Sequence, residues 1–219
     1  SQDASSTADM LTLYPGMLRI SHSNEDNIRK TDVQANELRS KMKAALSEEE
    51  YIKSLHLKLN FNCNDPGQII RISELSNKTN QFIFNYMRYT NSDLYHIFND
   101  CSYFTVTASL SDCLSDSGLI GVCIGKLKEN YVEIEDCFIS CRALGRGIDD
   151  IIVLGAMNTI LRHFSCSKLK VDFQKGPKNV PAERFVQKYL NQQFLAPSEF
   201  DYSIPEDLIS INYFYYGEM

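Results

Sequence analysis

Three strand-like runs follow one another between Tyr103 and Ile139, and this succession constrains the fold more than any other feature of the sequence. The runs cover residues 103–110, 119–127 and 131–139, and they are separated by the short polar stretches SDSG (115–118) and KEN (128–130). Connections this short join antiparallel neighbours, so we predict a three-stranded meander. The third run leads directly into a glycine-containing loop and then into a long apolar segment.

The segments on either side of the meander alternate between strand and helix patterns. Residues 57–63 alternate apolar and polar side chains, which is the period of a half-buried strand. We expect further strands at 168–174 and 208–216, and helices at 30–46, 48–56, from Pro66 past Leu75, from Asn91 or Ser92 to Phe98, at 148–164 and at 181–190. This order predicts an α/β (α+β) fold with a mixed central sheet and helices on both faces. Ser47 and Glu50 should form a capping box.

The totals bound the organisation of the chain. At 219 residues with 43% hydrophobic residues, it can bury one sizeable core. We divide it into an N-terminal tail and helical linker, residues 1–56, and one domain, residues 57–219. No apolar run is long enough to cross a bilayer and no signal peptide is visible, so we expect no membrane association. The net charge of −6 argues against a nucleic-acid binder.

Seven cysteines are scattered without a CxxC pair or an accompanying histidine cluster. This pattern favours a reduced, cytoplasmic chain over a disulfide framework, and it predicts no metal site.

The loop FISCRALGRGIDD (138–150) is the strongest candidate for a binding site. A strand–loop–helix junction with small residues presents unpaired backbone N–H groups at the positive end of a helix dipole, which attracts phosphate. Gly145 and Gly147 permit close approach of the backbone, and Arg142 and Arg146 add charge-assisted hydrogen bonds. An ordinary surface turn is the alternative.

The order R-x-x-G-x-G, after a meander and before a helix, resembles the pyrophosphate loop of the GNAT acyltransferases, which bind coenzyme A there. Further segments resemble the C-terminal, GNAT-like part of FkbH-like proteins: RISELSNKTNQF (71–82), RYT (88–90), GLIGV (118–122), VEIEDCFISCRALGRGI (132–148), and KN (178–179) followed by AERF. The similarity extends from about residue 30 to 195. Its most specific parts are KTNQF and SCRALGRG.

The resemblance implies an activity, a cofactor and partners. FkbH-like proteins typically join a HAD-type phosphatase domain to this GNAT-like domain, and they are associated with loading a glyceryl unit onto an acyl carrier protein. The implied cofactor is acetyl-CoA, coenzyme A or a phosphopantetheine thioester, held by Arg142, Ala143, Leu144, Gly145, Arg146 and Gly147. No DxDxT-type phosphatase motif occurs in this sequence. The expected activity is acyl transfer; the alternative is a non-catalytic module that docks a carrier protein beside a separate HAD-type phosphatase domain.

Two acidic residues and one cysteine are candidates for catalysis. Glu133 and Glu135 are two apart on a strand and therefore share a face, which we expect to include Tyr131 and Cys137. GNAT enzymes often place a base on this strand, and Glu135 matches the acidic position in the family's segment; a solvated or cross-paired face is the alternative. Cys141 is next to Arg142 near a helix N-terminus, which favours a reactive thiolate, whereas a packing role is the alternative.

The acceptor is expected to contact the segment after the first domain helix. Thr79, Asn80, Gln81 and Phe82, with Arg88 nearby, mix hydrogen-bonding groups with an aromatic ring. A turn in which these side chains bond to local backbone is the alternative.

The resemblance also assigns residues near the end of the domain. GNAT domains splay two strands to admit pantetheine, and Asn179 is placed to bond to that arm. Where the family has FY, this chain has Phe185 and Val186, so Tyr189 is the candidate to protonate the leaving thiolate. Residues 166–188 hold six basic and two acidic side chains, a net charge of +4 that suits a 3′-phosphate or an acidic carrier protein or, equally, a solvated face.

Overall fold

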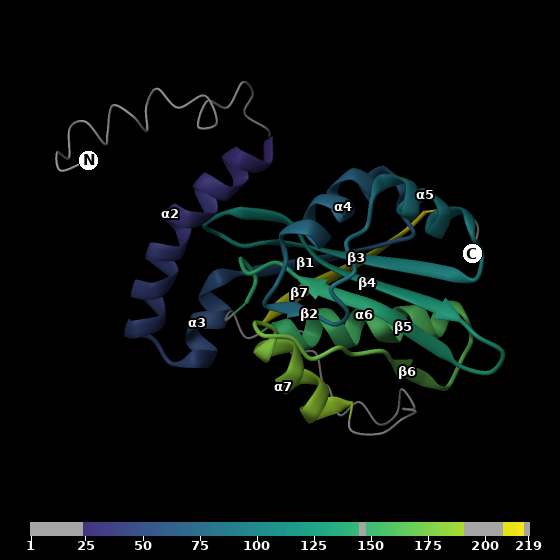
Figure 1. Cartoon of the computed structure of the whole chain (residues 1–219). Coiled ribbons are helices and arrows are strands. Elements are labelled where there is room, and N and C mark those ends of the chain that lie inside the picture. Colours follow the sequence, from purple (N-terminus) through teal and green to yellow (C-terminus); the bar gives the residue numbers. More distant parts are fainter. Residues whose placement is uncertain (1–23, 145–147, 191–207, 217–219) are drawn as a thin grey trace, which may run out of the picture.

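The computed structural model describes residues 24–144, 148–190 and 208–216. Its centre is a mixed seven-stranded sheet in the order β2-β5-β4-β3-β1-β7, with β6 also paired to β5 (Figure 1). The strands are β1 (Leu57–Cys63), β2 (Phe82–Ile83), β3 (Tyr103–Ser111), β4 (Asp116–Leu127), β5 (Val132–Ile139), β6 (Leu169–Val171) and β7 (Ile209–Tyr215). The predicted meander is β3–β4–β5, and the predicted α/β class is confirmed.

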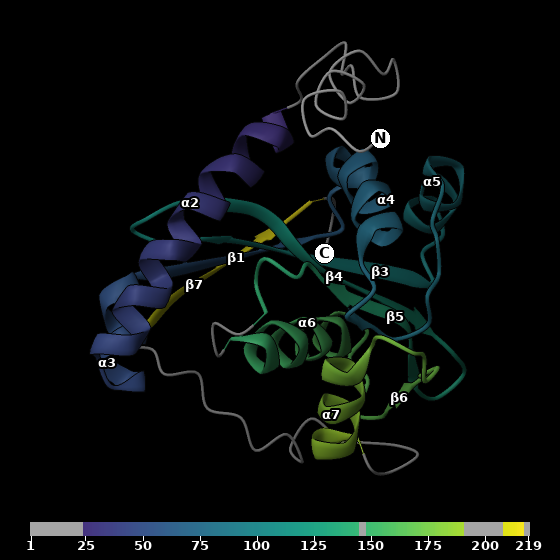
Figure 2. The same cartoon turned by 60° about the vertical axis from the view of Figure 1, so that its left-hand side comes forward.

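Helices cover both faces of the sheet. They are α2 (Asn24–Ala45), α3 (Glu48–Leu55), the 3-10 helix η2 (Pro66–Gln68), α4 (Ile69–Lys78), α5 (Asn91–Asn99), α6 (Asp149–His163) and α7 (Val180–Tyr189). Helices α4 and α5 lie on one face, and α6 and α7 lie on the other (Figure 2). Among the described helices, none is long and apolar enough to cross a membrane.

Local capping signals explain where two helices begin. Ser47 and Glu50 form the predicted capping box at the start of α3. The expected cap of α5 at Asn91 or Ser92 is wrong: Thr90 accepts the N–H of Asp93 over 3.2 Å, and the Asp93 carboxylate accepts the N–H of Thr90 over 2.9 Å. Threonine with an acidic residue three positions later supplies both halves of a capping box, which neither Asn91 nor Ser92 can do in this register.

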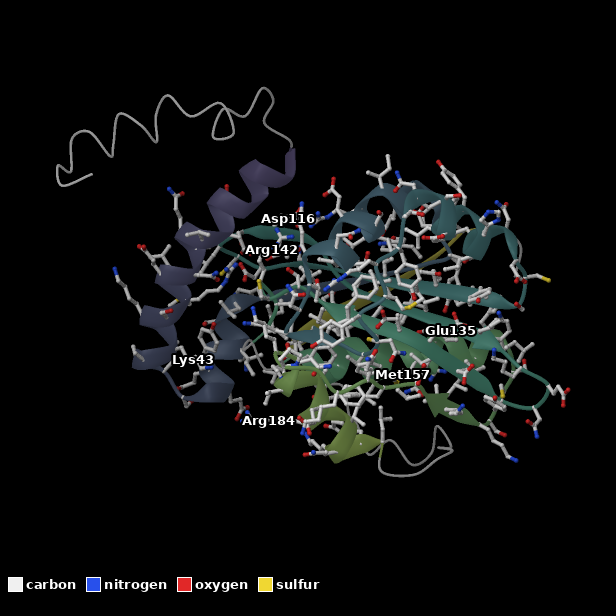
Figure 3. All side chains as sticks on the ribbon, viewed as in Figure 1. Lys43, Asp116, Glu135, Arg142, Met157 and Arg184 are labelled. Atoms are coloured by element: carbon white, nitrogen blue, oxygen red, sulfur yellow. The ribbon has the colours of Figure 1, made fainter. Side chains whose placement is uncertain are left out.

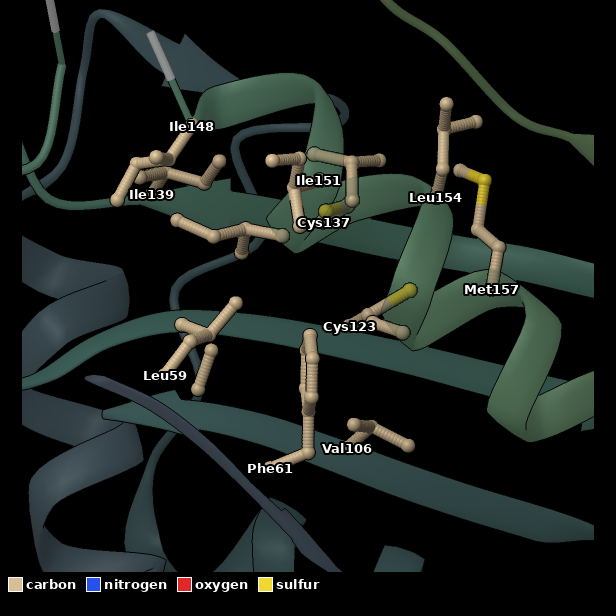
Figure 4. Close-up of a cluster of buried hydrophobic side chains, with 14 of the residues drawn as sticks. Leu59, Phe61, Val106, Cys123, Cys137, Ile139, Ile148, Ile151, Leu154 and Met157 are labelled. Carbon is tan, nitrogen blue, oxygen red and sulfur yellow. The ribbon is translucent and has the colours of Figure 1, made fainter. Parts of the chain in front are cut away.

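The larger core lies between the sheet and α6, whose broad apolar face was predicted from the sequence (Figure 4). Helix α6 approaches β4 closely because glycine stands at two contact positions. A Cβ atom at Gly125 would lie 2.5 Å from Cγ2 of Ile160, and one at Gly121 would lie 2.9 Å from Cγ2 of Ile152. A smaller core fills the space between the sheet and helices α4 and α5.

A β-bulge in β5 changes which side chains share a face. Ile124 pairs with Asp136 and Gly125 pairs with Ile134, so Glu135 is the extra residue. Beyond the bulge the alternation is shifted, and Cys137 points toward α6 beside Cys123 (Figure 4). Glu135 instead contacts Tyr103 on the opposite face. The expectation that Glu135 and Cys137 share a face is therefore wrong.

Helices α2 and α3 pack onto the sheet. Tyr51 and Leu55 of α3 are buried in the same core as the strands. The guanidinium of Arg39 on α2 is buried against two carboxylates, Asp32 at 2.9 Å and Asp112 at 2.8 Å. Asp112 lies in the β3–β4 connection, so this network fixes α2 against the meander. The division at residue 56 stays a prediction, and residues 1–23 lie outside the described part.

Candidate functional site

A cavity of about 290 Å³ opens where β5 ends. It joins the two most specific segments of the sequence, the one around Thr79 and the one around Arg142, and Lys178 adds a third. The lining residues are Arg71, Leu75, Lys78, Thr79, Asn80, Gln81, Ser140, Cys141, Arg142 and Lys178. We call it the β5-end cavity.

The α4 wall of this cavity is built from the C-terminal half of the helix and the chain that follows it. Thr79 ends α4 with an extended backbone, φ −87° and ψ 131°. Arg88 holds this end in place: Nη1 donates to the carbonyls of Ser76 and Thr79, and Nη2 donates to Oδ1 of Asn80 over 2.6 Å. Arg88 does not line the cavity and instead positions the residues that do.

The opposite wall is the start of the glycine-containing loop. Ser140 Oγ accepts from both the backbone N–H and Nε of Arg142, each over 3.4 Å, and Ala143 donates its N–H to the Ser140 carbonyl over 2.9 Å. Ala143 is buried under this turn, and Cys141 is exposed. Gly145, Arg146 and Gly147 lie outside the described residues.

Arg142 also borders a second cavity of about 290 Å³ on the side of α2 and α3. Its lining residues are Asn36, Arg39, Ser40, Lys43, Tyr51, Cys141, Arg142 and Leu144. Figure 3 shows Lys43 and Arg142 on this side of the molecule, with Glu135 farther along the sheet. Helix α2, which the sequence assigned to a linker, therefore reaches the loop.

The β5-end cavity is electropositive. Arg71, Lys78, Arg142 and Lys178 line it, whereas no carboxylate does among the described residues. Glu74 pairs with Arg71 over 2.9 Å and with Lys78 over 3.6 Å, from outside the lining. A concave surface lined by charge of one sign concentrates ions of the opposite sign. Sequence reasoning missed Arg71 and Lys78, although their spacing of seven places both on one face of a helix.

Strand β2 fills the space between β5 and the chain that follows β6. Phe82 pairs with Ile139 and Ile83 with Phe138, and Phe84 donates its N–H to the Cys137 carbonyl over 3.0 Å. On the other side, Gln174 donates its N–H to the Phe84 carbonyl over 2.8 Å. Residues 82–85, which we call the β2 segment, therefore lie between β5 and the chain that follows β6.

The side chain of Asn179 holds the β2 segment in place through hydrogen bonds. Its buried side chain donates to the carbonyls of Ile83 and Gln174, each over 3.0 Å, and accepts the N–H of Gly176 over 2.8 Å. These contacts use the amide on which the expected pantetheine contact depends. Phe82 is also buried, with its ring 5.9 Å from that of Phe185, so it does not join Thr79, Asn80 and Gln81 in the cavity.

Asp136 is a buried carboxylate that sequence reasoning missed. Its Oδ1 accepts N–H groups from Cys137 (2.8 Å), Asn85 (3.1 Å) and Phe84 (3.2 Å), while Oδ2 has no hydrogen-bond partner among the described residues. Burial raises the pKa of Asp136 to about 6, although hydrogen bonds from the backbone N–H groups of Asn85, Cys137, Phe84 and Met87 act in the opposite direction. Asp136 thus fastens the β2 segment to β5.

The two glutamates of β5 have different surroundings. Glu135 accepts the hydroxyl of Tyr103 over 3.2 Å, and Tyr103 in turn accepts from Lys126 over 2.8 Å. Glu133 is paired with Lys170 (2.9 Å) and Lys128 (3.2 Å), and the hydrogen bond from Lys170 is the main cause that lowers the pKa of Glu133. Neither glutamate lines the β5-end cavity.

The start of α6 faces α7 through a carboxylate. The Tyr189 hydroxyl donates to Asp150 over 2.6 Å and Lys188 donates to the same oxygen over 2.8 Å. Burial and the bond to Asp150 raise the pKa of Tyr189. Asp149 and Asp150 also put two carboxylates in the first turn of α6, which weakens the attraction of that helix end for phosphate.

Three of the six basic side chains in the stretch 166–188 are paired with carboxylates. Lys170 contacts Glu133, Lys175 contacts Glu183 and Lys188 contacts Asp150, whereas Lys178 lines the β5-end cavity. Across the described ranges, no group of three or more His, Cys, Asp or Glu side chains is arranged to hold a metal ion.

Several solved structures resemble this fold. A dodecameric spermidine N-acetyltransferase from Vibrio cholerae is 13% identical, with a TM-score of 0.45 over 65% of this chain and 96% of its own. An aminoglycoside N-acetyltransferase in complex with CoA is 10% identical, with a TM-score of 0.44 over 59% and 85%. The ribosomal-protein-S18-alanine N-acetyltransferase from Escherichia coli is 6% identical, with a TM-score of 0.44 over 59% and 75%.

All three are N-acetyltransferases. Identities and TM-scores this low assign no activity to this chain. No protein-family model matches it, and no curated protein matches it in sequence.

Proposed function

We propose that this chain is a GNAT-type acyltransferase domain of the FkbH-like kind, acting on a pantetheine thioester carried by coenzyme A or by a carrier protein. The observation that carries the proposal is the position of Arg142, which lines the β5-end cavity at the start of the glycine-containing loop. A charge-assisted hydrogen bond from this guanidinium suits the phosphate that precedes a pantetheine arm.

The proposed chemistry is direct transfer. An acceptor N–H or O–H group attacks the thioester carbonyl carbon, the C–S bond breaks, and the thiolate leaves and takes up a proton from solvent. Glu135 accepts the proton of the attacking group, which is why it must be ionised and fixed in orientation. The hydrogen bond from Tyr103 fixes its orientation, and the Lys126 ammonium lies 3.9 Å from its carboxylate.

A second candidate function is the non-catalytic docking module, and the β2 segment favours it. Phe82, Ile83 and Phe84 are buried side chains, and exposing each costs about 1.5–3 kcal/mol. Displacing all three to admit a pantetheine arm would consume most of the roughly 8 kcal/mol that a micromolar ligand supplies. A module that binds only the phosphate end of its partner avoids this cost.

Thermal unfolding with coenzyme A tests the shared part of both functions. A ligand bound only by the native state raises the unfolding midpoint. We expect a rise at millimolar coenzyme A and, for Arg142→Ala, an affinity about tenfold lower or more, because a hydrogen bond to a charged group contributes about 1.5–3 kcal/mol. Lys58→Ala, exposed on β1, is the matched control. An unmoved midpoint would overturn the acyltransferase proposal.

An assay of acyl transfer distinguishes the acyltransferase from the docking module. The acyltransferase must consume an acyl-CoA or an acylated carrier protein in the presence of an acceptor, with release of free thiol. Binding of coenzyme A without any release of thiol, across amine and hydroxyl acceptors, would leave the docking module as the remaining candidate.

A further inference from the structure

We infer that the α4 wall of the β5-end cavity, together with Lys178, binds a phosphate or carboxylate group carried by the acceptor molecule. This inference rests on the proposed acyl transfer and adds the chemical class of its second substrate: a small anion rather than a polyamine or another cation. The residues that carry it are Arg71, Lys78, Thr79 and Lys178.

The C-terminal end of α4 accounts for only some of the basic side chains at this cavity. Basic side chains near a helix C-terminus pair with its free carbonyls and with its dipole, which accounts for Lys78 and for Arg88 behind the wall. Arg71 belongs to the first turn of α4, and Lys178 comes from the connection between β6 and α7. Two separate segments thus bring positive charge to a cavity whose described lining contains no carboxylate.

Lys178 is the clearest member of this set. Lys170, Lys175 and Lys188 lie in the same basic stretch, and each is in contact with a carboxylate. The described part of the chain places no carboxylate in ion-pair contact with Lys178, which is exposed at the cavity rim. Its charge is therefore available to a bound anion.

The hydrogen-bonding groups of the wall also favour an anion. Arg88 donates to the carbonyls of Ser76 and Thr79, so these acceptors are already engaged within the protein. The Oδ1 atom of Asn80 is likewise taken by Arg88. Asn80 and Gln81, whose side chains each carry N–H donors, line the cavity beside the cations. Cations and N–H donors together match a phosphate or carboxylate.

Position assigns this anion to the acceptor rather than to the cofactor. Helix α4 lies on the face of the sheet opposite to α6 and α7 (Figure 2). The loop that is proposed to hold the cofactor's phosphate forms the opposite wall of the cavity and leads away to α6, on the other face. A cavity of about 290 Å³ is at the lower limit for small-molecule sites, so it accommodates a small substrate or one end of it.

The test is a titration of the full chain with inorganic phosphate at constant ionic strength. Binding is monitored by NMR through the chemical shifts of the backbone amides of Thr79, Gln81 and Ser140. The variants are Arg71→Gln and Lys178→Gln, with Lys58→Gln as the charge-matched control on β1. Because Arg71→Gln also breaks the pair with Glu74, Lys178→Gln is the cleaner variant. Every titration is repeated with saturating coenzyme A.

We expect saturable shifts at these amides, a dissociation constant about tenfold higher in each cavity variant, and no change in Lys58→Gln. The shifts should persist with coenzyme A present. Shifts that fail to saturate, or an equal effect of Lys58→Gln, would reduce the site to general surface charge and overturn the inference. Loss of the shifts with coenzyme A would assign the cavity to the cofactor's phosphate and would also overturn it.

The two proposals fail separately. Coenzyme A binding without phosphate shifts would remove the acceptor site and leave the proposed function in place. Saturable phosphate binding in a chain that does not bind coenzyme A would remove the proposed function and keep the anion site.

Discussion

The side-chain amide of Asn179 donates a hydrogen bond to the backbone carbonyl of Ile83 over 3.0 Å, and this bond ties the start of α7 to β2. Asp136 holds the same segment from the side of β5, through the N–H groups of Phe84 and Asn85. Two buried polar side chains from distant parts of the sequence therefore fix the β2 segment between β5 and the chain after β6. Whether this segment is permanent or displaceable decides between transfer and docking.

Asn179→Ala tests the structural role of this amide. The substitution leaves the carbonyls of Ile83 and Gln174 and the N–H of Gly176 without their buried partner. We expect the free energy of unfolding to fall by about 3 kcal/mol, because each unsatisfied buried group costs roughly 1–3 kcal/mol. Urea unfolding at constant m-value measures it. A variant with unchanged stability but lost coenzyme A binding would show that Asn179 is a ligand contact instead.

The titration of Asp136 should appear in the pH dependence of stability. Burial raises its pKa from 3.8 to about 6, so between these values the native state binds more protons than the unfolded chain. The stabilisation is complete below about pH 4 and is lost as the pH rises through 6, a change on the order of 3 kcal/mol for a shift of about two units.

Asp136→Asn is the variant that isolates this titration. It keeps an oxygen for the three N–H groups and removes the charge, so the free energy of unfolding should no longer fall between pH 4 and 6. Urea unfolding at a series of pH values gives the slope, and carboxyl NMR gives the pKa directly. A slope that is identical in wild type and variant would contradict the buried, protonatable state.

Arg39 should be essential for the attachment of α2. Removing the guanidinium leaves the buried carboxylates of Asp32 and Asp112 without their ion-pair partner. Breaking a buried ion pair by deleting one partner costs about 3–5 kcal/mol. We therefore expect Arg39→Ala to lower the stability by that amount in urea unfolding. Lys41→Ala, exposed on the same helix, should change it by less than about 0.5 kcal/mol. If the two variants behave alike, α2 is not part of the cooperative unit.

Local signals made much of the fold predictable. The meander, the apolar face of α6 and the capping box at Ser47 follow from periodicity and from spacings of a few residues. Strand β2 did not follow, because two residues carry no period and its place depends on Asp136 and Asn179. The bulge at Glu135 and the parallel pairing of β7 with β1 are likewise set by tertiary contacts.

The site was predictable in pieces. Thr79, Asn80, Gln81 and Arg142 were found as motif residues, and the structure brings them into one cavity. Their convergence with Arg71 and Lys178 was not predictable, because it depends on how α4 and the β6–α7 connection meet the end of β5. Asn179 and Phe82 have motif positions too, yet both are buried around the β2 segment.

Cysteine reactivity should follow exposure. Cys141, Cys101 and Cys113 are exposed, whereas burial raises the pKa of Cys63 to about 11 and also raises that of Cys137. We expect iodoacetamide near neutral pH to label the exposed group first, by peptide mass spectrometry. Cys141→Ser should leave acyl transfer within about twofold of wild type if transfer is direct. An acyl adduct on Cys141 that disappears with the mutation would instead establish a covalent route.

Glu135→Gln is the sharpest test of catalysis, because Glu133 on the same strand provides a matched control. Glu135 accepts the Tyr103 hydroxyl and is not closed off by a lysine hydrogen bond, whereas Glu133 is held by Lys170 and Lys128. If Glu135 is the base, the Glu135→Gln substitution should reduce the rate of transfer by about a hundredfold or more and leave the affinity for coenzyme A unchanged. Glu133→Gln should reduce the rate only slightly. Equal rates for both variants and wild type would remove Glu135 from the mechanism, and a chain inactive in all three forms would favour docking.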